Sequence, residues 1–138
     1  MSFREKSAWA MAIVMTVAGI FYFNLIAQVT MELGSGPPPP IVIPYIMLIV
    51  IGSIVAQSAL AFSTPKEATA RADERERQIL QRAGNWSGLL FSTGAVLSLV
   101  HFLVYSDGNI LFHLIMASMT LSQISEYVVQ IALFRSRA

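Results

Sequence analysis

The sequence predicts an all-α integral membrane protein with four transmembrane helices, and three observations lead to this fold class. The chain of 138 residues is 55% hydrophobic and only 12% charged, which departs from the usual composition of soluble domains. Its apolar residues gather in four stretches of roughly 20 residues, the length at which a helix crosses a hydrocarbon core of about 30 Å. Its basic residues lie at only one end of each stretch.

The four predicted spans form one membrane domain over residues 1–138. They cover residues 7–29, 41–62, 86–105 and 110–134. The first span follows two basic residues, as the apolar core of a signal peptide would, but it is longer than the roughly 7–15 residues of such a core. We therefore expect this span to be retained.

The basic residues predict the orientation of the spans. They lie before the first span, between the second and third, and after the fourth: Arg4, Lys6, Lys66, Arg71, Arg75, Arg77, Arg82, Arg135 and Arg137. The positive-inside rule then places both termini and the middle connection in the cytoplasm. Trp9 and Trp86 fall at the inner interface, where amphipathic rings settle at headgroup depth.

The two outer connections differ in kind. Residues 106–109 are a short run of turn formers, so the third and fourth spans are expected to pair as a tight antiparallel hairpin. Residues 31–40 contain a flexible Gly-Ser-Gly segment followed by four prolines, which favours a spacer with a stiff end.

The cytoplasmic connection predicts a helix over residues 64–84. Thr64 is a candidate cap, Pro65 suits the first helical position, and Glu67 lies three residues after the cap. Gly84 is a candidate stop. Acid-first pairs at i,i+4, such as Glu67 with Arg71, add about 0.3–0.5 kcal/mol each. The spacing predicts a helix of about five turns.

This charged helix has two interpretations. It is a solvated linker, or it is a docking surface for a cytoplasmic protein. The candidate docking residues are Asp73, Glu74, Arg75, Glu76 and Arg77. The mixture of four acids with five bases in this connection argues against a polybasic lipid-binding segment, which needs charges of one sign.

Asp73, Glu74, Arg75, Glu76 and Ile79 resemble a motif of an uncharacterised family of small bacterial membrane proteins with four spans. In that family an Asp-Glu-Arg-Asp/Glu motif, followed closely by isoleucine, lies in the middle cytoplasmic loop, and chain length and span order are similar. The resemblance implies a multi-pass protein of the bacterial inner (cytoplasmic) membrane. Some proteins of that kind are thought to accompany small helix-turn-helix regulators, which implies a regulatory membrane partner.

Polar residues inside the predicted spans form a second candidate site. Glu126 is costly in lipid if it is ionised and isolated. Gln123 and Gln130 lie on the same face of the fourth span, three and four residues away, and Asn24 of the first span is a further candidate. These residues predict a buried proton or cation site, or they serve as interhelical hydrogen-bonding groups.

His101 and His113 flank the outer hairpin turn, where paired imidazoles can bind a metal or haem. Two ligands are few, and hydrogen bonding in the outer leaflet is the alternative, so no metal or cofactor is predicted. The absence of cysteine excludes thiol chemistry.

No catalytic or nucleic-acid-binding motif occurs in the sequence. The sequence therefore favours a non-enzymatic membrane interaction or regulatory protein that presents its charged cytoplasmic helix to a soluble partner or a membrane complex. The alternative is a small oligomeric transporter or channel that uses Glu126. Rows of small residues four apart, such as Gly84 and Gly88, make a homo-oligomer a further expectation.

Overall fold

The computed structural model describes residues 1–136 and has an all-α fold, as predicted. Arg137, one of the residues used to predict the orientation, lies outside the described residues. The elements in chain order are α1 (Phe3–Leu33), η1 (Pro39–Val42), α2 (Ile43–Ser63), α3 (Pro65–Ala68), α4 (Glu74–Tyr105) and α5 (Gly108–Arg135).

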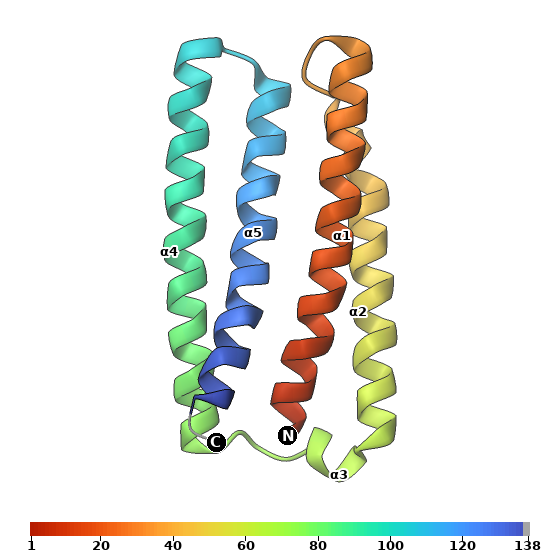
Figure 1. Cartoon of the computed structure of the whole chain (residues 1–138), viewed down its shortest axis with the longest axis vertical. Helices are drawn as coiled ribbons and strands as arrows, with labels where there is room; N and C mark the ends of the chain where they lie inside the picture. The colour runs from red at the N-terminus through yellow and green to blue at the C-terminus, as the bar shows by residue number, and fades with distance from the viewer. Residues whose placement is uncertain (137–138) are drawn as a thin grey trace.

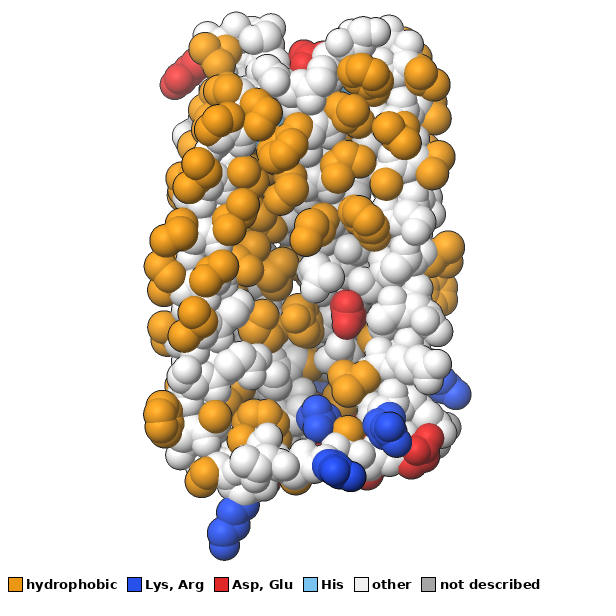
Figure 2. Space-filling view, turned by 180° about the vertical axis from the view of Figure 1, so that it is seen from behind, with side chains coloured by type: hydrophobic (Ala, Val, Ile, Leu, Met, Phe, Trp, Pro, Cys, Tyr) orange, Lys and Arg blue, Asp and Glu red, His pale blue; other side chains and the backbone are white. Residues whose placement is uncertain are grey.

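The four long helices run side by side and alternate in direction (Figure 1). Their order across the molecule is α4, α5, α1, α2, so α4 packs on α5 and α2 packs mainly on α1. The N-terminus, α3 and the end of α5 lie at the same end of the molecule (Figure 1). This is the end at which Lys and Arg side chains gather (Figure 2).

Three of the helices are long and apolar enough to cross a membrane: α1, the continuous segment Pro39–Ser63, and α4. Their apolar side chains point mostly outward, with Ile54, Val55 and Leu97 61%, 62% and 64% exposed. Hydrophobic side chains cover most of the length of the face shown in Figure 2. Because soluble proteins rarely expose such a large apolar surface, the fold is that of a multi-pass membrane protein in contact with lipid.

The outer hairpin is as tight as the sequence predicts. α4 ends where Ser106 takes a left-handed conformation with φ of 54°, and Asp107 begins α5 as its N-cap. The Asp107 carboxylate accepts hydrogen bonds from the backbone N–H groups of Asn109 and Ile110 at 2.9 and 3.1 Å. These caps satisfy the helix ends and force α5 to return alongside α4.

The predicted cytoplasmic helix over residues 64–84 requires correction. α3 ends at Ala68, a non-helical segment follows, and α4 then runs without interruption through Gly84 to Tyr105. The cause is a capping box at Asp73: its carboxylate accepts from the N–H of Glu76 at 2.7 Å, while the Glu76 carboxylate accepts from the N–H of Asp73 at 3.3 Å. Most of the predicted cytoplasmic helix and the predicted third span are therefore one helix, α4.

Two apolar clusters hold the helices together. Ala18 and Tyr22 of α1 pack with Val42 and Tyr45 near the outer end. Ala8 and Ala12 of α1 pack with Ile131 of α5 near the other end. α1 is thus the helix on which both α2 and α5 converge, whereas α4 is attached through α5.

Candidate functional site

Basic residues near the N-terminus hold the connection between α2 and α4 in place. The Arg4 guanidinium pairs with the Glu76 carboxylate at 3.2 Å and also donates to the Ala70 carbonyl at 3.4 Å. Lys6 lies 3.8 Å from the Glu67 carboxylate. Such pairs contribute at most about 1 kcal/mol each near water, but together they fix the path of the chain between α3 and α4 against the start of α1.

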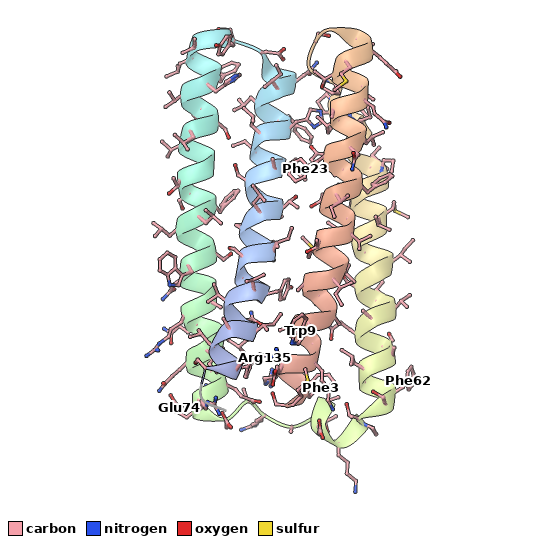
Figure 3. The ribbon with its side chains drawn as sticks, in the orientation of Figure 1. Phe3, Trp9, Phe23, Phe62, Glu74 and Arg135 are labelled. Carbon is pink, nitrogen blue, oxygen red and sulfur yellow. The ribbon has the colours of Figure 1, made fainter. Side chains whose placement is uncertain are left out.

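Arg135 links the two ends of the chain. Its guanidinium lies 3.7 Å from the Glu5 carboxylate and 5.1 Å from the centre of the Trp9 ring, within the range of a cation–π interaction. Figure 3 shows Trp9 and Arg135 near each other at the lower end of α1 and α5. The charged end of the molecule is therefore an ordered surface tied to the helices.

The five predicted docking residues have different roles in this surface. Asp73 and Glu76 form the capping box of α4, and Glu76 also binds Arg4. Arg75 donates to the Phe134 carbonyl of α5 at 3.3 Å. Glu74 and Arg77 pair with each other at 3.9 Å, with side chains 76% and 71% exposed. Three of the five are thus engaged in holding the helices, and two project into solvent.

The predicted buried polar site comes together only in part. The Gln130 amide, which is buried, donates to the Glu126 carboxylate at 3.3 Å, and Glu126 itself is half-buried. Gln123 is half-buried on the same helix. The Glu126–Gln130 pair is a local contact within α5.

Asn24 lies far from Glu126. It is exposed, and its amide donates to the Ile20 carbonyl of its own helix at 2.8 Å. The neighbouring Tyr22 contacts His113, and the residues from His113 to Glu126 correspond to about 20 Å of helix. Asn24 therefore does not join a site at Glu126 within one chain.

His113 is buried in a hydrogen-bonded network, as one sequence-based alternative expected, but with partners that the sequence did not predict. Its Nε2 lies 2.9 Å from the carbonyl oxygen of Pro37, and its Nδ1 lies 2.6 Å from the Tyr22 hydroxyl. Since a carbonyl only accepts, Nε2 carries a proton, and a neutral ring then accepts at Nδ1 from the tyrosine O–H. Both ring nitrogens are committed, which leaves His113 without a lone pair for a metal.

A second buried pair adjoins this network. The Tyr45 hydroxyl is hydrogen-bonded to the Thr120 hydroxyl, which in turn donates to the Met116 carbonyl at 2.8 Å. The rings of Tyr22 and Tyr45 lie 4.7 Å apart. The network joins α1, α2 and α5, and it fastens the proline-containing connection onto them.

His101 is separate from His113 in its contacts. Its ring stacks on Tyr105 of the same helix at 4.5 Å, and its buried Nδ1 has no hydrogen-bond partner within the described part of the chain. Among residues 1–136, no group of three or more His, Cys, Asp and Glu side chains has the arrangement of a metal site. His101 thus packs on Tyr105, whereas His113 is hydrogen-bonded to other segments.

Comparison of the chain with protein-family models, with curated proteins and with solved structures finds no match. The fold defines a multi-pass α-helical membrane protein, and its distinctive feature is the ordered charged surface formed by the N-terminus, α3 and the start of α4.

Proposed function

We propose that this protein is a non-enzymatic membrane interaction or regulatory protein whose cytoplasmic surface binds a soluble partner or a larger membrane complex. The surface comprises the exposed side chains of α3, of the connection that follows it, and of the first turn of α4. The observation that carries the proposal is the exposure of Glu74 and Arg77, 76% and 71%, on a segment that neighbouring contacts hold in place.

An ordered surface is suited to recognition because binding then costs less conformational entropy. Arg4, Asp73 and Glu76 order the segment, so Glu74 and Arg77 are not required for the fold. Charged side chains that are not needed for packing are available to select a partner of complementary charge and to accelerate its association.

The proposal includes an orientation in the bacterial inner membrane, with both termini in the cytoplasm and α5 as a fourth span. α5 has 28 residues, or about 42 Å of helix, and it runs antiparallel to α4 along that helix (Figure 1). Its polar side chains His113, Thr120 and Gln130 are buried against neighbours, which keeps them from the hydrocarbon.

A charge exchange tests the interaction. Glu74→Arg combined with Arg77→Glu keeps the i,i+3 pair and the net charge but inverts the surface. The native protein, purified from its own membranes in mild detergent, is expected to carry a stoichiometric partner that the exchanged variant loses. The matched control is Glu32→Lys, an exposed change at the opposite end, which should retain the partner. Equal recovery with the exchanged variant would overturn the proposal.

The alternative function is a small oligomeric transporter or channel centred on Glu126. The specific observation in its favour is the hydrogen bond from the buried Gln130 amide to this half-buried carboxylate. It requires that the native protein conduct protons or cations in liposomes and that Glu126→Gln abolish this flux. Liposomes that stay impermeable with the native protein would remove the alternative.

Self-association is also part of the proposal. Among the long helices α4 packs mainly on α5, and added Cβ atoms at Gly84 and Gly88 would meet nothing within 4 Å in residues 1–136. Small residues at such positions allow another helix to approach closely in a bilayer. Gly88→Cys is expected to form a covalent dimer in oxidised membranes, while the exposed control Val55→Cys on α2 does not.

A further inference from the structure

The structure separates the basic and acidic side chains of the cytoplasmic connection, which the sequence presents as a mixture. The acids Glu67 and Glu76 face the N-terminus and pair with Lys6 and Arg4. Arg75 and Arg82 lie on another side of α4 and form no ion pair within residues 1–136. The overall balance of charge therefore does not describe the local charge at the start of α4.

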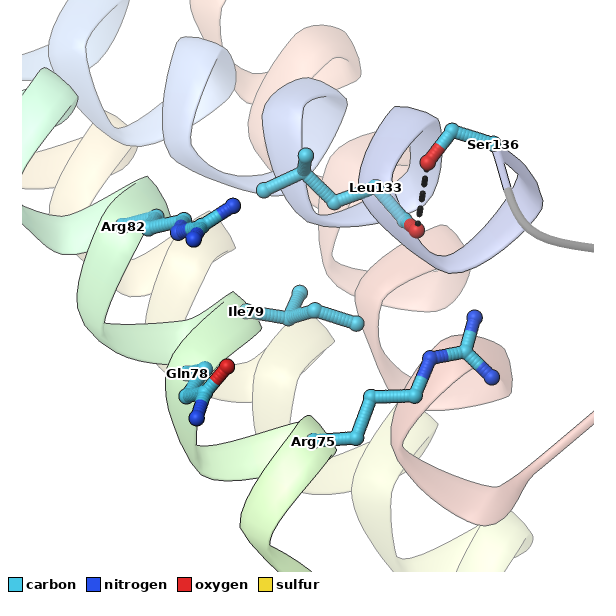
Figure 4. A pocket seen from close by; sticks show the side chains of 6 residues that line it. All are labelled: Arg75, Gln78, Ile79, Arg82, Leu133 and Ser136. Atoms are coloured by element: carbon cyan, nitrogen blue, oxygen red, sulfur yellow. Dashed lines mark hydrogen bonds between the residues drawn. The ribbon is translucent and has the colours of Figure 1, made fainter.

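Arg75 and Arg82 border a small recess between α4 and α5 (Figure 4). Figure 4 shows their side chains extending toward α5 on either side of Ile79. The recess is lined by Arg75, Gln78, Ile79, Arg82, Leu133 and Ser136, a set without any acid. Its volume of about 40 Å³ admits a water or a single oxygen atom, so a larger anion would rest at its mouth between the two guanidinium groups.

An apolar groove continues from this recess along the same two helices. It has a volume of about 380 Å³ and is lined by Trp86, Leu89, Leu90, Thr93, Ser125 and Val129. On α4 the residues of the recess and the groove follow at spacings of three and four, which places them on one face. Trp86 lies one turn beyond Arg82, and Val129 lies one turn before Leu133, so the groove and the recess adjoin.

The dimensions fit one leaflet of a bilayer. The residues from Arg82 to Thr93 correspond to about 16 Å of helix, close to half of a hydrocarbon core of about 30 Å. Trp86 is 63% exposed at the junction of the basic and apolar parts, the depth at which tryptophan settles beside headgroups. The basic end lies at the molecular end that carries the termini (Figure 1).

From this arrangement we infer that the seam between α4 and α5 binds an anionic phospholipid of the inner leaflet. Its phosphate accepts hydrogen bonds from the guanidinium groups of Arg75 and Arg82, and one acyl chain lies in the groove along Trp86, Leu90 and Val129. Guanidinium groups are suited to phosphate because their donors form a planar fork. Arg75 already contacts the end of α5 through the Phe134 carbonyl, so the bound lipid fastens the two helix ends together.

Quenching of Trp86 fluorescence tests the inference. The chain has two tryptophans, so Trp9→Phe makes Trp86 the single reporter, and the full chain in this background is reconstituted into phosphatidylcholine vesicles. Brominated phosphatidylglycerol is expected to quench Trp86 at a lower mole fraction than brominated phosphatidylcholine. Equal quenching by the two lipids would overturn the inference.

Variants of the basic end and of the groove test its two parts. Each of Arg75→Gln and Arg82→Gln should weaken the preference for phosphatidylglycerol about fivefold, whereas the control Arg71→Gln, an exposed arginine outside the recess, should not. Thr93→Phe fills the groove and should weaken quenching by both lipids. The control Ser92→Phe, a neighbouring exposed hydroxyl residue outside the groove, should leave quenching unchanged.

The remaining outcomes also decide the inference. A preference that survives the loss of both arginines would exclude the proposed headgroup contact, and unchanged quenching in Thr93→Phe would exclude the acyl groove. Inorganic phosphate at matched ionic strength should leave the preference in place. If inorganic phosphate removes the preference while chloride does not, the recess binds free phosphate, and the inference of a lipid ligand is overturned.

Discussion

The ring of His113 connects three segments that are far apart in sequence: α1 through Tyr22, the outer connection through Pro37, and α5 itself. Removing the partner of a buried polar group destabilises the folded state, because neither lipid nor the packed interior replaces the hydrogen bond. The stability of the outer half of the molecule therefore depends on individual polar atoms as well as on apolar packing.

Tyr22→Phe is expected to lower the free energy of unfolding by about 1–2 kcal/mol, because it leaves His113 Nδ1 without a donor. The measurement is denaturant-induced unfolding of the purified protein in mixed micelles. Tyr105→Phe is the matched control, since Tyr105 is 68% exposed, and it should be neutral. Equal stability of Tyr22→Phe and the native protein would show that this hydrogen bond contributes no net stability.

The sequence predicted the contacts of individual polar residues less well than the helices themselves. His113 was correctly placed near the outer turn, but its partners Tyr22 and Pro37 follow only from the packing of α1 against α5. Asn24 and Glu126 were grouped by their polarity alone, and helix geometry separates them. Polar residues in a span indicate that partners are needed, but the identity of the partners depends on helix rotation and register.

At the scale of elements, the start of α4 illustrates why helix boundaries are hard to predict. Helices begin after both Thr64 and Asp73, with a break between them, but the Thr64 hydroxyl donates back to the Leu60 carbonyl and does not cap α3. Asp73 is the stronger start signal because Glu76 completes a reciprocal capping box. Glycine inside a helix costs about 1 kcal/mol relative to alanine. The remaining residues of the long helix offset this cost at Gly84. The apolar stretches and the hairpin turn were predicted because length and turn chemistry specify them locally.

Asp73→Ala is expected to destabilise the protein by about 1 kcal/mol through loss of the N-cap, and to increase amide hydrogen exchange in the first turn of α4. The control is Glu74→Ala, because the Glu74 side chain is 76% exposed and its pair with Arg77 contributes little. Comparable exchange in both variants would contradict the role assigned to the capping box.

Two glycines of α4 should respond oppositely to alanine. An added Cβ at Gly94 would lie 2.7 Å from the Ser118 Cβ of α5, whereas at Gly88 it would meet nothing within 4 Å in residues 1–136. Gly94→Ala should therefore cost about 1–3 kcal/mol by forcing α4 from α5. Gly88→Ala should be neutral or stabilising by up to about 1 kcal/mol. Unfolding in mixed micelles measures both, and a neutral Gly94→Ala would mean that the seam widens without cost.

At the scale of the whole molecule, the arrangement is a row in which α1 and α5 are covered on two sides and α2 and α4 present most of their side chains outward (Figures 1 and 2). Such a molecule depends on lipid or on further copies of itself to cover its flanks, because exposure of apolar area to water costs roughly 25 cal/mol per Å². The bilayer is thus part of what stabilises the fold, and its orientation in the bilayer determines which surface meets the cytoplasm.

The orientation can be measured with single cysteines, because the sequence contains none. A membrane-impermeant maleimide applied to intact cells is expected to label Ser35→Cys and Tyr105→Cys at the outer end. Thr69→Cys and Ser136→Cys should react only after permeabilisation, since α3 and the end of α5 lie together at the other end (Figure 1). The reverse pattern would place the charged surface and the lipid seam on the outer side. Labelling of Ser136→Cys but not Thr69→Cys in intact cells would mean that α5 does not cross back beside α4, which contradicts four spans.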